Sequence, residues 1–493
     1  MKRFYFVLFL ISFFQITCLF SEENGVEEEL NLDIELSDLK LDEQKNGGDS
    51  KTGASSPESK TYLFQGKLLA FLGIGIKTPN SYSLNYDRIQ LEMNQIYKNI
   101  IFKLKANARY NKFYENQLNP LTGENVDGYR RGENFRLDIP EASVNCEYLP
   151  DSLLNQFNLI IGIQTVNWGK ADEFRPTDIL SPQDTTTQFI EDRNDRKFGK
   201  FGVKTVFTFT DTMRFETIWF PLQRTAEFTM DDQSPFSPPY YLGLLKQGYG
   251  MNAYKLPDQK VEHSDLAVKG YFQLFEIDFS LSFYNGYHPQ PFIKISPDAT
   301  STAGYSMTPF LNRITMWGFD FEKAAGAGFV FRGESAYFSK GMLFGTGTDT
   351  SFPLYVKHGS NGYVEKKLVS NTLGFDKNDF LIQKLYLNIQ YSFDYIFDYE
   401  NGLYASGISA DEINHLLIWA VNYEWFNSVF FLEFAGSYNL KEKDYFFNPN
   451  FRVKLGIETK LIVGGMFFGG NQNTNLGQFK EKDYGYIKLE HLF

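Results

Sequence analysis

The sequence is poor in cysteine and in long apolar runs, and it has fewer basic than acidic residues. Cys18 and Cys146 are the only cysteines among 493 residues, and removal of an N-terminal segment would leave Cys146 without an intramolecular partner. No apolar run of about 18 residues follows the N-terminus, which excludes a helical membrane protein. The net charge of −12 and the isoelectric point of about 5.1 argue against nucleic-acid binding.

The chain is instead rich in aromatic residues without being apolar on average. Aromatic residues make up 17% of the sequence, although the mean hydropathy is −0.33. A hydrophobic content of 43% can bury a large surface, which excludes a disordered chain for the part that follows residue 60. The composition therefore indicates a large β-protein in which aromatic and polar residues alternate.

The first 60 residues differ from the rest. Lys2 and Arg3 precede an apolar run, which predicts a cleaved signal peptide over 1–21. Lipidation at Cys18 is the less favoured alternative, because its flank lacks the small residues typical of such sites. Residues 22–60 hold 12 acidic and 4 basic side chains and predict an acidic, disordered periplasmic leader, although an alternation of Leu and Ile over 30–36 would allow pairing with a partner.

From residue 61 to 493, period-two alternation dominates the sequence. In 275–283, Phe and aliphatic residues occupy every odd position, while Glu, Asp and Ser occupy the even ones. Residues 385–397 repeat the pattern over a longer stretch. Such alternation is typical of either a soluble β-sandwich with one solvent-exposed face or a transmembrane barrel with a lipid-facing surface and a water-filled lumen.

Three observations favour the barrel over the sandwich. Many alternating segments run for 11 residues or more, which is long for a soluble strand but enough to cross a bilayer at a tilt. The polar face carries full charges on many strands. Aromatic residues recur near strand ends, including Trp168, Trp219, Trp317 and Trp425, as interfacial girdles require.

The predicted fold class is therefore all-β, a transmembrane antiparallel β-barrel of 16 to 18 strands with short periplasmic turns and long outer loops. The candidate strands are 62–76, 82–95, 99–114, 134–149, 155–168, 198–210, 213–224, 262–274, 276–286, 312–323, 326–339, 379–398, 413–425, 429–440, 449–459, 460–470 and 483–493. Long polar connections are expected at 115–133, 169–197, 225–261, 287–311 and 340–378. These strands are odd in number, whereas both ends in the periplasm require an even number, so one strand is missing, and 352–372 is the place expected for it.

Two segments resemble known outer-membrane proteins. The last strand ends in Phe493 after alternating apolar residues, and it resembles the C-terminal signal that barrel-assembly machinery recognises, although His491 replaces the usual aromatic residue. Residues 162–184 contain Gly162-Ile-Gln164, Trp168-Gly169 and Phe174-Arg175-x-x-Asp178, and resemble a segment of large, poorly characterised porin-like outer-membrane proteins. Ser181 stands where that family usually has Asn.

The resemblance implies a porin-like barrel and no catalytic residues. Arg175 is expected to pair with Asp172 or Asp178, and the loop 169–197 is expected either to fold against the inner wall as a charged constriction or to seal the barrel mouth. The five histidines show no metal-ligand spacing, and no nucleophile or phosphate-binding motif is visible, so no enzyme activity, metal or cofactor is expected.

Three functions remain open. The favoured one is a channel for small solutes, set in a lipid bilayer, with Asp172, Arg175 and Asp178 at the constriction. The residues expected to line its lumen are Lys103, Lys105, Arg109, Lys204, Arg214, Arg452 and Lys454, together with acidic Glu92, Asp278 and Glu433. A specific transporter for apolar compounds, using inward aromatics such as Tyr271 and Tyr386, and an adhesin using 235–249 are the alternatives; a homo-oligomer is left open.

Overall fold

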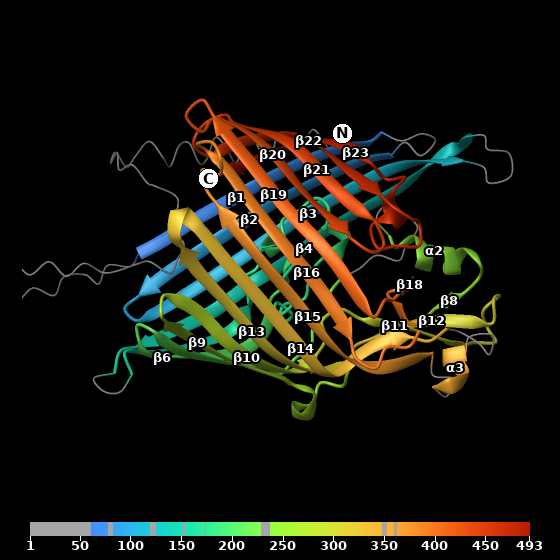
Figure 1. Cartoon of the computed structure of the whole chain (residues 1–493), viewed down its shortest axis with the longest axis horizontal. Coiled ribbons are helices and arrows are strands. Elements are labelled where there is room, and N and C mark those ends of the chain that lie inside the picture. Colours follow the sequence, from blue (N-terminus) through green and yellow to red (C-terminus); the bar gives the residue numbers. More distant parts are fainter. Residues whose placement is uncertain are drawn as a thin grey trace, which may run out of the picture. The chain divides into compact units, whose positions relative to one another are not determined.

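The computed structural model describes residues 61–76, 82–118, 125–150, 154–172, 174–227, 237–347, 353–358 and 362–493. The expected signal peptide and leader (1–60) lie outside these residues. The described part is one closed antiparallel barrel of 18 long strands (Figure 1). The fold class predicted from the alternation is confirmed, and the strand number is the upper value of the expected range.

The barrel strands follow one another around the ring in chain order. Their bounds are β1 (Thr61–Gly75), β2 (Tyr82–Tyr97), β3 (Ile100–Leu118), β4 (Asn125–Tyr148), β5 (Gln156–Gln164), β6 (Lys200–Thr210), β7 (Met213–Phe220), β9 (Asp265–Leu274), β10 (Ile277–Tyr287), β13 (Arg313–Ala325), β14 (Phe329–Gly345), β15 (Tyr363–Lys377), β16 (Leu385–Ile396), β19 (Ile413–Trp425), β20 (Phe430–Asn439), β21 (Tyr445–Lys454), β22 (Thr459–Gly469) and β23 (Tyr484–Leu492).

The ring closes between the first and the last strand. β1 pairs with β23 in antiparallel register from Lys67 opposite Leu492 to Gly75 opposite Tyr484. Beyond that register, the Gly66 amide donates to the carbonyl of Phe493 at 2.6 Å and the Phe493 amide donates back at 2.9 Å. Closure removes both free sheet edges, as a strand structure inside a bilayer requires.

Connections at the two ends of the barrel differ in length. β2–β3, β6–β7 and β9–β10 are joined by two-residue turns, at Lys98-Asn99, Asp211-Thr212 and Phe275-Glu276. At the opposite end, the connections carry additional elements (Figure 1): α2 (Pro239–Lys246), α3 (Pro353–Lys357), the paired strands β8 (Gly250–Met251), β11 (Phe292–Pro297) and β12 (Tyr305–Phe310), and the hairpin β17 (Tyr404–Ala405) and β18 (Ile408–Ser409). The expected division into short turns and long loops is therefore present.

The missing strand is β15. The long connection expected over 340–378 was wrong, because β14 continues to Gly345 and β15 occupies 363–377. The outward positions of the first half of β15 include Glu365 and Lys367, both exposed, so no apolar face marks it in the sequence. The connection expected at 115–133 is likewise shorter, since β3 and β4 pair as far as Leu118 and Asn125.

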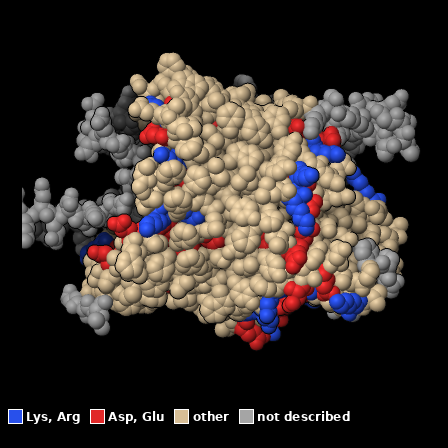
Figure 2. Space-filling view, in the orientation of Figure 1, with Lys and Arg blue, Asp and Glu red and all other residues tan. Residues whose placement is uncertain are grey.

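The outer face of the barrel is apolar. Large hydrophobic side chains are exposed at alternate positions of many strands, among them Phe64, Leu72, Phe201, Trp219, Leu281, Trp317, Leu373 and Ile487. Figure 2 shows a broad uncharged surface over the strands, with charged side chains gathered toward the strand ends. This band suits lipid contact. No helix of the described residues has both the length and the apolar character needed to span a membrane.

The inner face is polar in part and apolar in part. Ser280 and Ser282 of β10 face inward and are buried, as the alternation predicts, but Tyr284 on the same face is fully buried in an apolar cluster. Leu69 and Phe71 of β1 belong to a second internal cluster. Some inward positions are therefore apolar, because the chain between β5 and β6 folds inside the ring and packs against them.

Candidate functional site: the inserted segment in the lumen

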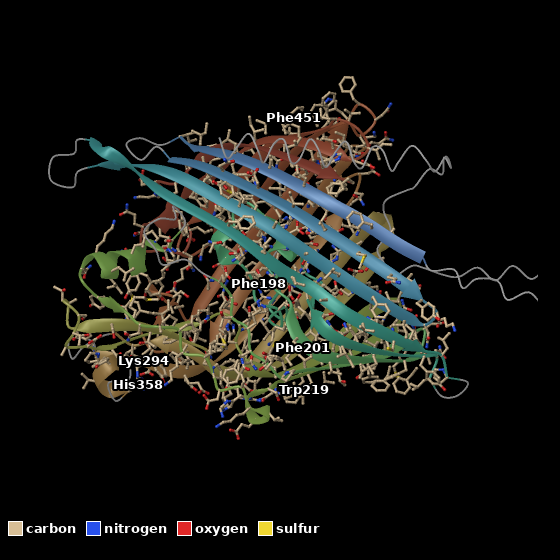
Figure 3. The ribbon with its side chains drawn as sticks, turned by 180° about the vertical axis from the view of Figure 1, so that it is seen from behind. Phe198, Phe201, Trp219, Lys294, His358 and Phe451 are labelled. Carbon is tan, nitrogen blue, oxygen red and sulfur yellow. The ribbon has the colours of Figure 1, made fainter. Side chains whose placement is uncertain are left out.

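The connection between β5 and β6, here called the inserted segment and described over 165–172 and 174–199, lies inside the barrel. Its residues contact inward side chains of β2 and β3 on one part of the ring and of β14 and β16 on another. A segment that reaches strands so far apart around a closed ring has to cross the lumen. Of the two alternatives left open for 169–197, the fold against the inner wall is the one observed. Phe198, labelled in Figure 3, is fully buried, whereas Phe201 and Trp219 are exposed.

One end of the segment is held by an arginine wall on β2, β3 and β4. Arg88 lies 2.7 Å from Glu191 and 2.6 Å from Asp195, and Arg109 Nη2 donates to the carbonyl oxygen of Asp195 at 2.8 Å. Arg136 pairs with Asp184. Because Arg88 and Glu191 have no exposed side-chain area, these contacts form a desolvated anchor and not a surface ion pair.

A carboxylate of β14 holds the other end. Glu334 accepts hydrogen bonds from the Thr177 amide at 2.6 Å, the Thr177 hydroxyl at 2.7 Å, and the amides of Lys170 and Ala171 at 3.1 and 3.3 Å. A Cβ on Gly169, whose φ is +90°, would lie 2.3 Å from the Glu334 carboxylate. Gly169 is therefore required both for its backbone conformation and for this close approach.

The Trp-Gly motif itself is part of the internal core. Trp168 is 1% exposed, and its indole nitrogen donates to Glu216 of β7 at 2.9 Å. The assignment of Trp168 to an interfacial girdle was therefore wrong, whereas Trp219 and Trp317 are exposed on the outer face. An indole buried next to apolar neighbours with its N–H satisfied anchors the end of β5 firmly.

Inside the segment, Asp178 makes the local contacts. Its carboxylate accepts from the Trp168 amide at 3.2 Å, from Lys197 Nζ at 2.6 and 2.8 Å, and from Arg193 Nε at 3.2 Å. Arg175 does not pair with either expected carboxylate in these contacts; its Nε donates to the backbone carbonyl of Asp172 at 3.0 Å. Ser181, at the position where the resembling family has Asn, accepts from the Val166 amide through its hydroxyl at 2.7 Å.

Asp172 attaches the inserted segment to β14 and β16. Its carboxylate accepts hydrogen bonds from Asn388 and, at 2.8 Å, from Gln390, both on β16, and lies 3.7 Å from Arg332 of β14. Its side chain is 42% exposed, in contrast to the fully buried side chain of Asp178. Of these two carboxylates, Asp172 is thus the one that is accessible to solvent.

The remaining site candidates lie on the inward faces of four strands, β3, β6, β7 and β21. Lys204 of β6 pairs with Glu216 at 2.8 Å, and the guanidinium of Arg214 on β7 lies 4.2 Å from the Tyr271 ring centre. Arg452 pairs with Glu433 at 2.7 Å, and Lys454 lies 5.2 Å from the Phe431 ring centre.

On β3, three candidates share the inward face with the arginine wall. Lys105 stands opposite Glu92 of β2 and Glu141 of β4 in the strand register, and Lys103 lies two residues away. Arg109 is 3% exposed and is occupied by the inserted segment and by Asp138 at 3.3 Å. Sequence reasoning missed Arg88, Glu191 and Glu334, because only the fold brings Arg88 to Glu191 and Glu334 to Thr177.

Within the described residues, no group of three or more His, Cys, Asp or Glu side chains could hold a metal ion. The inward charged side chains are instead paired with one another and with the inserted segment inside the barrel.

No family model matches the chain, and no curated protein matches it. The chain is similar to several solved outer-membrane porins. OccAB1 of Acinetobacter baumannii has a TM-score of 0.47 at 9% identity and covers 88% of this chain and 96% of its own. OccK7 (OpdD) of Pseudomonas aeruginosa gives 0.46 at 7% identity, over 88% and 98%. OprB of Pseudomonas putida, in its low-pH structure, gives 0.37 at 7% identity, over 88% and 92%. At such identities the likeness concerns the fold alone.

Proposed function

We propose that this chain is a porin-like channel of the outer membrane that passes small solutes through a lumen narrowed by the inserted segment. The observation that carries the proposal is the attachment of this segment to well-separated parts of the wall through Glu191, Asp195 and Asp172. In this proposal, the charged and polar groups that hold the segment also set the width of the passage that it leaves.

The proposed passage is lined by charges of both signs. Lys103, Lys105, Lys204, Arg214, Arg452, Lys454, Asp172 and Arg175 are the lining residues we propose. Arg109 and Asp178 are left out of this set, because both are buried in ion pairs that hold the inserted segment. Their role is to keep the constriction in place.

Planar-bilayer recording of the purified chain tests the channel. We expect steady ohmic current steps that shrink when polyethylene glycols small enough to enter the lumen replace part of the water. A chain that inserts into the bilayer, shown by heat-modifiable gel migration, but passes no current would contradict the proposal.

A second candidate function is a transporter for apolar compounds. Two apolar clusters inside the barrel favour it, one around Trp168 and Tyr284 and one around Phe71 and Tyr486. Such a transporter would be silent in the bilayer and would speed the uptake of apolar solutes into proteoliposomes, whereas the channel would admit small polar solutes.

The proposal includes export and assembly. We propose that residues 1–21 are cleaved as a signal peptide, that 22–60 form a periplasmic leader, and that the strand ending in Phe493 is recognised by the barrel-assembly machinery. We expect mass spectrometry of the outer-membrane protein to show a mature N-terminus at Glu22. We propose no catalytic role. Native gels of the same purified protein would measure the number of subunits.

A further inference from the structure

A cavity of about 290 Å³ lies within the barrel, at the strand ends that carry the long connections. It is bordered by the ends of β14 and β16, the start of β19, and the β17–β18 hairpin, which pairs with Gly345 of β14. Its size is close to the lower limit of about 300 Å³ for small-molecule pockets. The cavity is separate from the contacts that anchor the inserted segment.

One side of the cavity is apolar. Met342 and Phe344 of β14, Leu368 of β15 and Ile396 of β16 line it, and the last three are buried members of the internal core. A rigid apolar wall of this kind binds the hydrocarbon part of a ligand by removing it from water, at about 25 cal/mol for each Å² buried.

The other side of the cavity is acidic. Asp394 of β16, and Asp411 and Glu442 of the neighbouring connections, line it. Asp394 accepts a hydrogen bond from Ser370, and Lys441 Nζ lies 2.6 Å from Asp411. The hydrogen bond to Asp411, together with burial and the negative charge of Asp411, raises the pKa of Glu442. Two carboxyl groups this close gain from the arrival of a positive charge.

The ion pair with Lys441 supplies one positive charge against these three carboxyl groups. The lining contains no lysine or arginine among the described residues, and burial lowers the pKa of His288, the lining histidine. Asn414 and Asn439 line the same side and are hydrogen bonded to one another at 2.7 Å. The polar side of the cavity therefore offers mainly oxygen acceptors.

We propose that this cavity binds small organic cations, in which an ammonium group is attached to an apolar body. The ammonium group would lie among Asp394, Asp411 and Glu442, and its N–H donors match their oxygens. The apolar body would lie against Met342, Phe344 and Ile396. The proposal rests on the proposed channel only for the way in which such a solute enters the lumen.

Calorimetric titration of the detergent-solubilised full chain tests the site with four matched probes. We expect 2-phenylethylammonium to bind at least about tenfold more tightly than 2-phenylethanol, which lacks the charge, and than methylammonium, which lacks the apolar body. We expect phenylacetate, which has the opposite charge, not to bind. Equal binding of the alcohol and the ammonium compound, or binding of phenylacetate, would overturn the proposal.

Two conservative variants locate the binding in this cavity. Asp394→Asn and Glu442→Gln each keep the side-chain shape, and we expect each to weaken 2-phenylethylammonium binding at least about tenfold. Glu424→Gln is the matched control, because Glu424 lines a different cavity near Lys384 at the other end of the barrel. Unchanged binding in both variants, or an equal loss in the control, would refute the site.

The binding assay does not depend on conductance, so the two proposals fail separately. Binding by a chain that passes no current would refute the channel and leave the site in place. Ohmic current without binding of 2-phenylethylammonium would refute the site and leave the channel in place.

Discussion

Arg88 Nη1 of β2 lies 2.7 Å from Glu191 Oε1 of the inserted segment, and neither side chain has any exposed area. A guanidinium and a carboxylate buried together inside the barrel fix the position of the segment, because either charge alone would be strongly unfavourable there. The width of the proposed passage would therefore depend on a few desolvated contacts between the wall and this segment.

Loss of one member of this pair should release the segment. We expect Arg88→Met or Glu191→Gln to cost about 3 to 5 kcal/mol locally, because an unpaired charge or an unsatisfied donor stays buried. Single-channel recordings should then show a larger and noisier conductance. In the double variant Arg88→Met/Glu191→Met, the conductance and its noise should return toward the wild-type values. Lys260→Met is the control, since Lys260 is 59% exposed in its ion pair; single variants that behave like this control would contradict the anchoring role.

Glu334→Gln should loosen the other end of the segment. A Gln amide keeps one acceptor but turns an NH₂ donor toward backbone amides, so at least one charge-assisted bond, worth about 1.5 to 3 kcal/mol, is lost. We expect the amides of Lys170, Ala171 and Thr177 to exchange hydrogen about tenfold to a hundredfold faster. Exchange in Glu424→Gln should match the wild type, and unchanged exchange at all three amides of Glu334→Gln would rule out the anchoring role of the carboxylate.

Cys146 tests which side chains of β4 face lipid. It lies on the outward face of β4, opposite Ile100 and Leu159, whereas the neighbouring Asn145 is inward and 9% exposed. In a chain with Cys18→Ser, a charged methanethiosulfonate should modify Cys146 slowly in proteoliposomes. In the variant that also carries Cys146→Ser and Asn145→Cys, the same reagent should react faster. Faster labelling of Cys146 would reverse the assignment of the two faces.

Glu400 should resist protonation in mild acid. Its carboxylate accepts hydrogen bonds from Lys357 and Lys366, with a further one from His358, and these lower its pKa to about 2. A depressed pKa means that the stabilisation is complete above the ordinary value of about 4.3 and is lost as pH falls through about 2. We expect the exchange protection of the His358 amide, which bonds to the Leu354 carbonyl at 2.9 Å, to stay constant from pH 7 to pH 5 and to fall at lower pH toward 2.

Glu400→Gln is the control for this pH dependence. It removes the charge that the lysines bind, so the His358 amide should be less protected at neutral pH and should lose the acid-dependent step. A step centred near pH 4 in the wild type would show that the lysines do not depress the pKa of Glu400.

Closure of the ring should be sensitive to Gly66. A Cβ at this position would lie 2.4 Å from the phenyl ring of Phe493, so the Phe493 side chain has to move for an alanine to fit. We expect Gly66→Ala to cost about 1 to 3 kcal/mol by overpacking and to lower the temperature of the heat-modifiable gel shift. Gly456→Ala, where no atom lies within 4 Å of the added Cβ, should leave that temperature unchanged. Equal temperatures for both variants would show that the Phe493 side chain moves at little cost in stability.

The sequence alone was enough to predict the barrel, because period-two alternation records which side chains face lipid. The candidate strands 198–210 and 213–224 placed the turn at Asp211-Thr212 correctly, and the odd number of candidate strands showed that one was missing. β15 was not found, since alternation marks a strand only where an apolar medium covers one of its faces. Glu365 and Lys367 are exposed outward residues in a part of β15 that has no such apolar face.

What lies inside the barrel was decided only by the tertiary structure. The sequence showed that 162–184 was unusual, but nothing in it pairs Glu191 with Arg88 or Glu334 with Thr177, because ion pairs and hydrogen bonds across a lumen join residues that have no fixed spacing. The outer surface faces lipid all around the barrel, so its apolar residues alternate regularly and the alternation is visible in the sequence. The inner surface contacts the inserted segment, and which residues contact each other there depends on the tertiary structure.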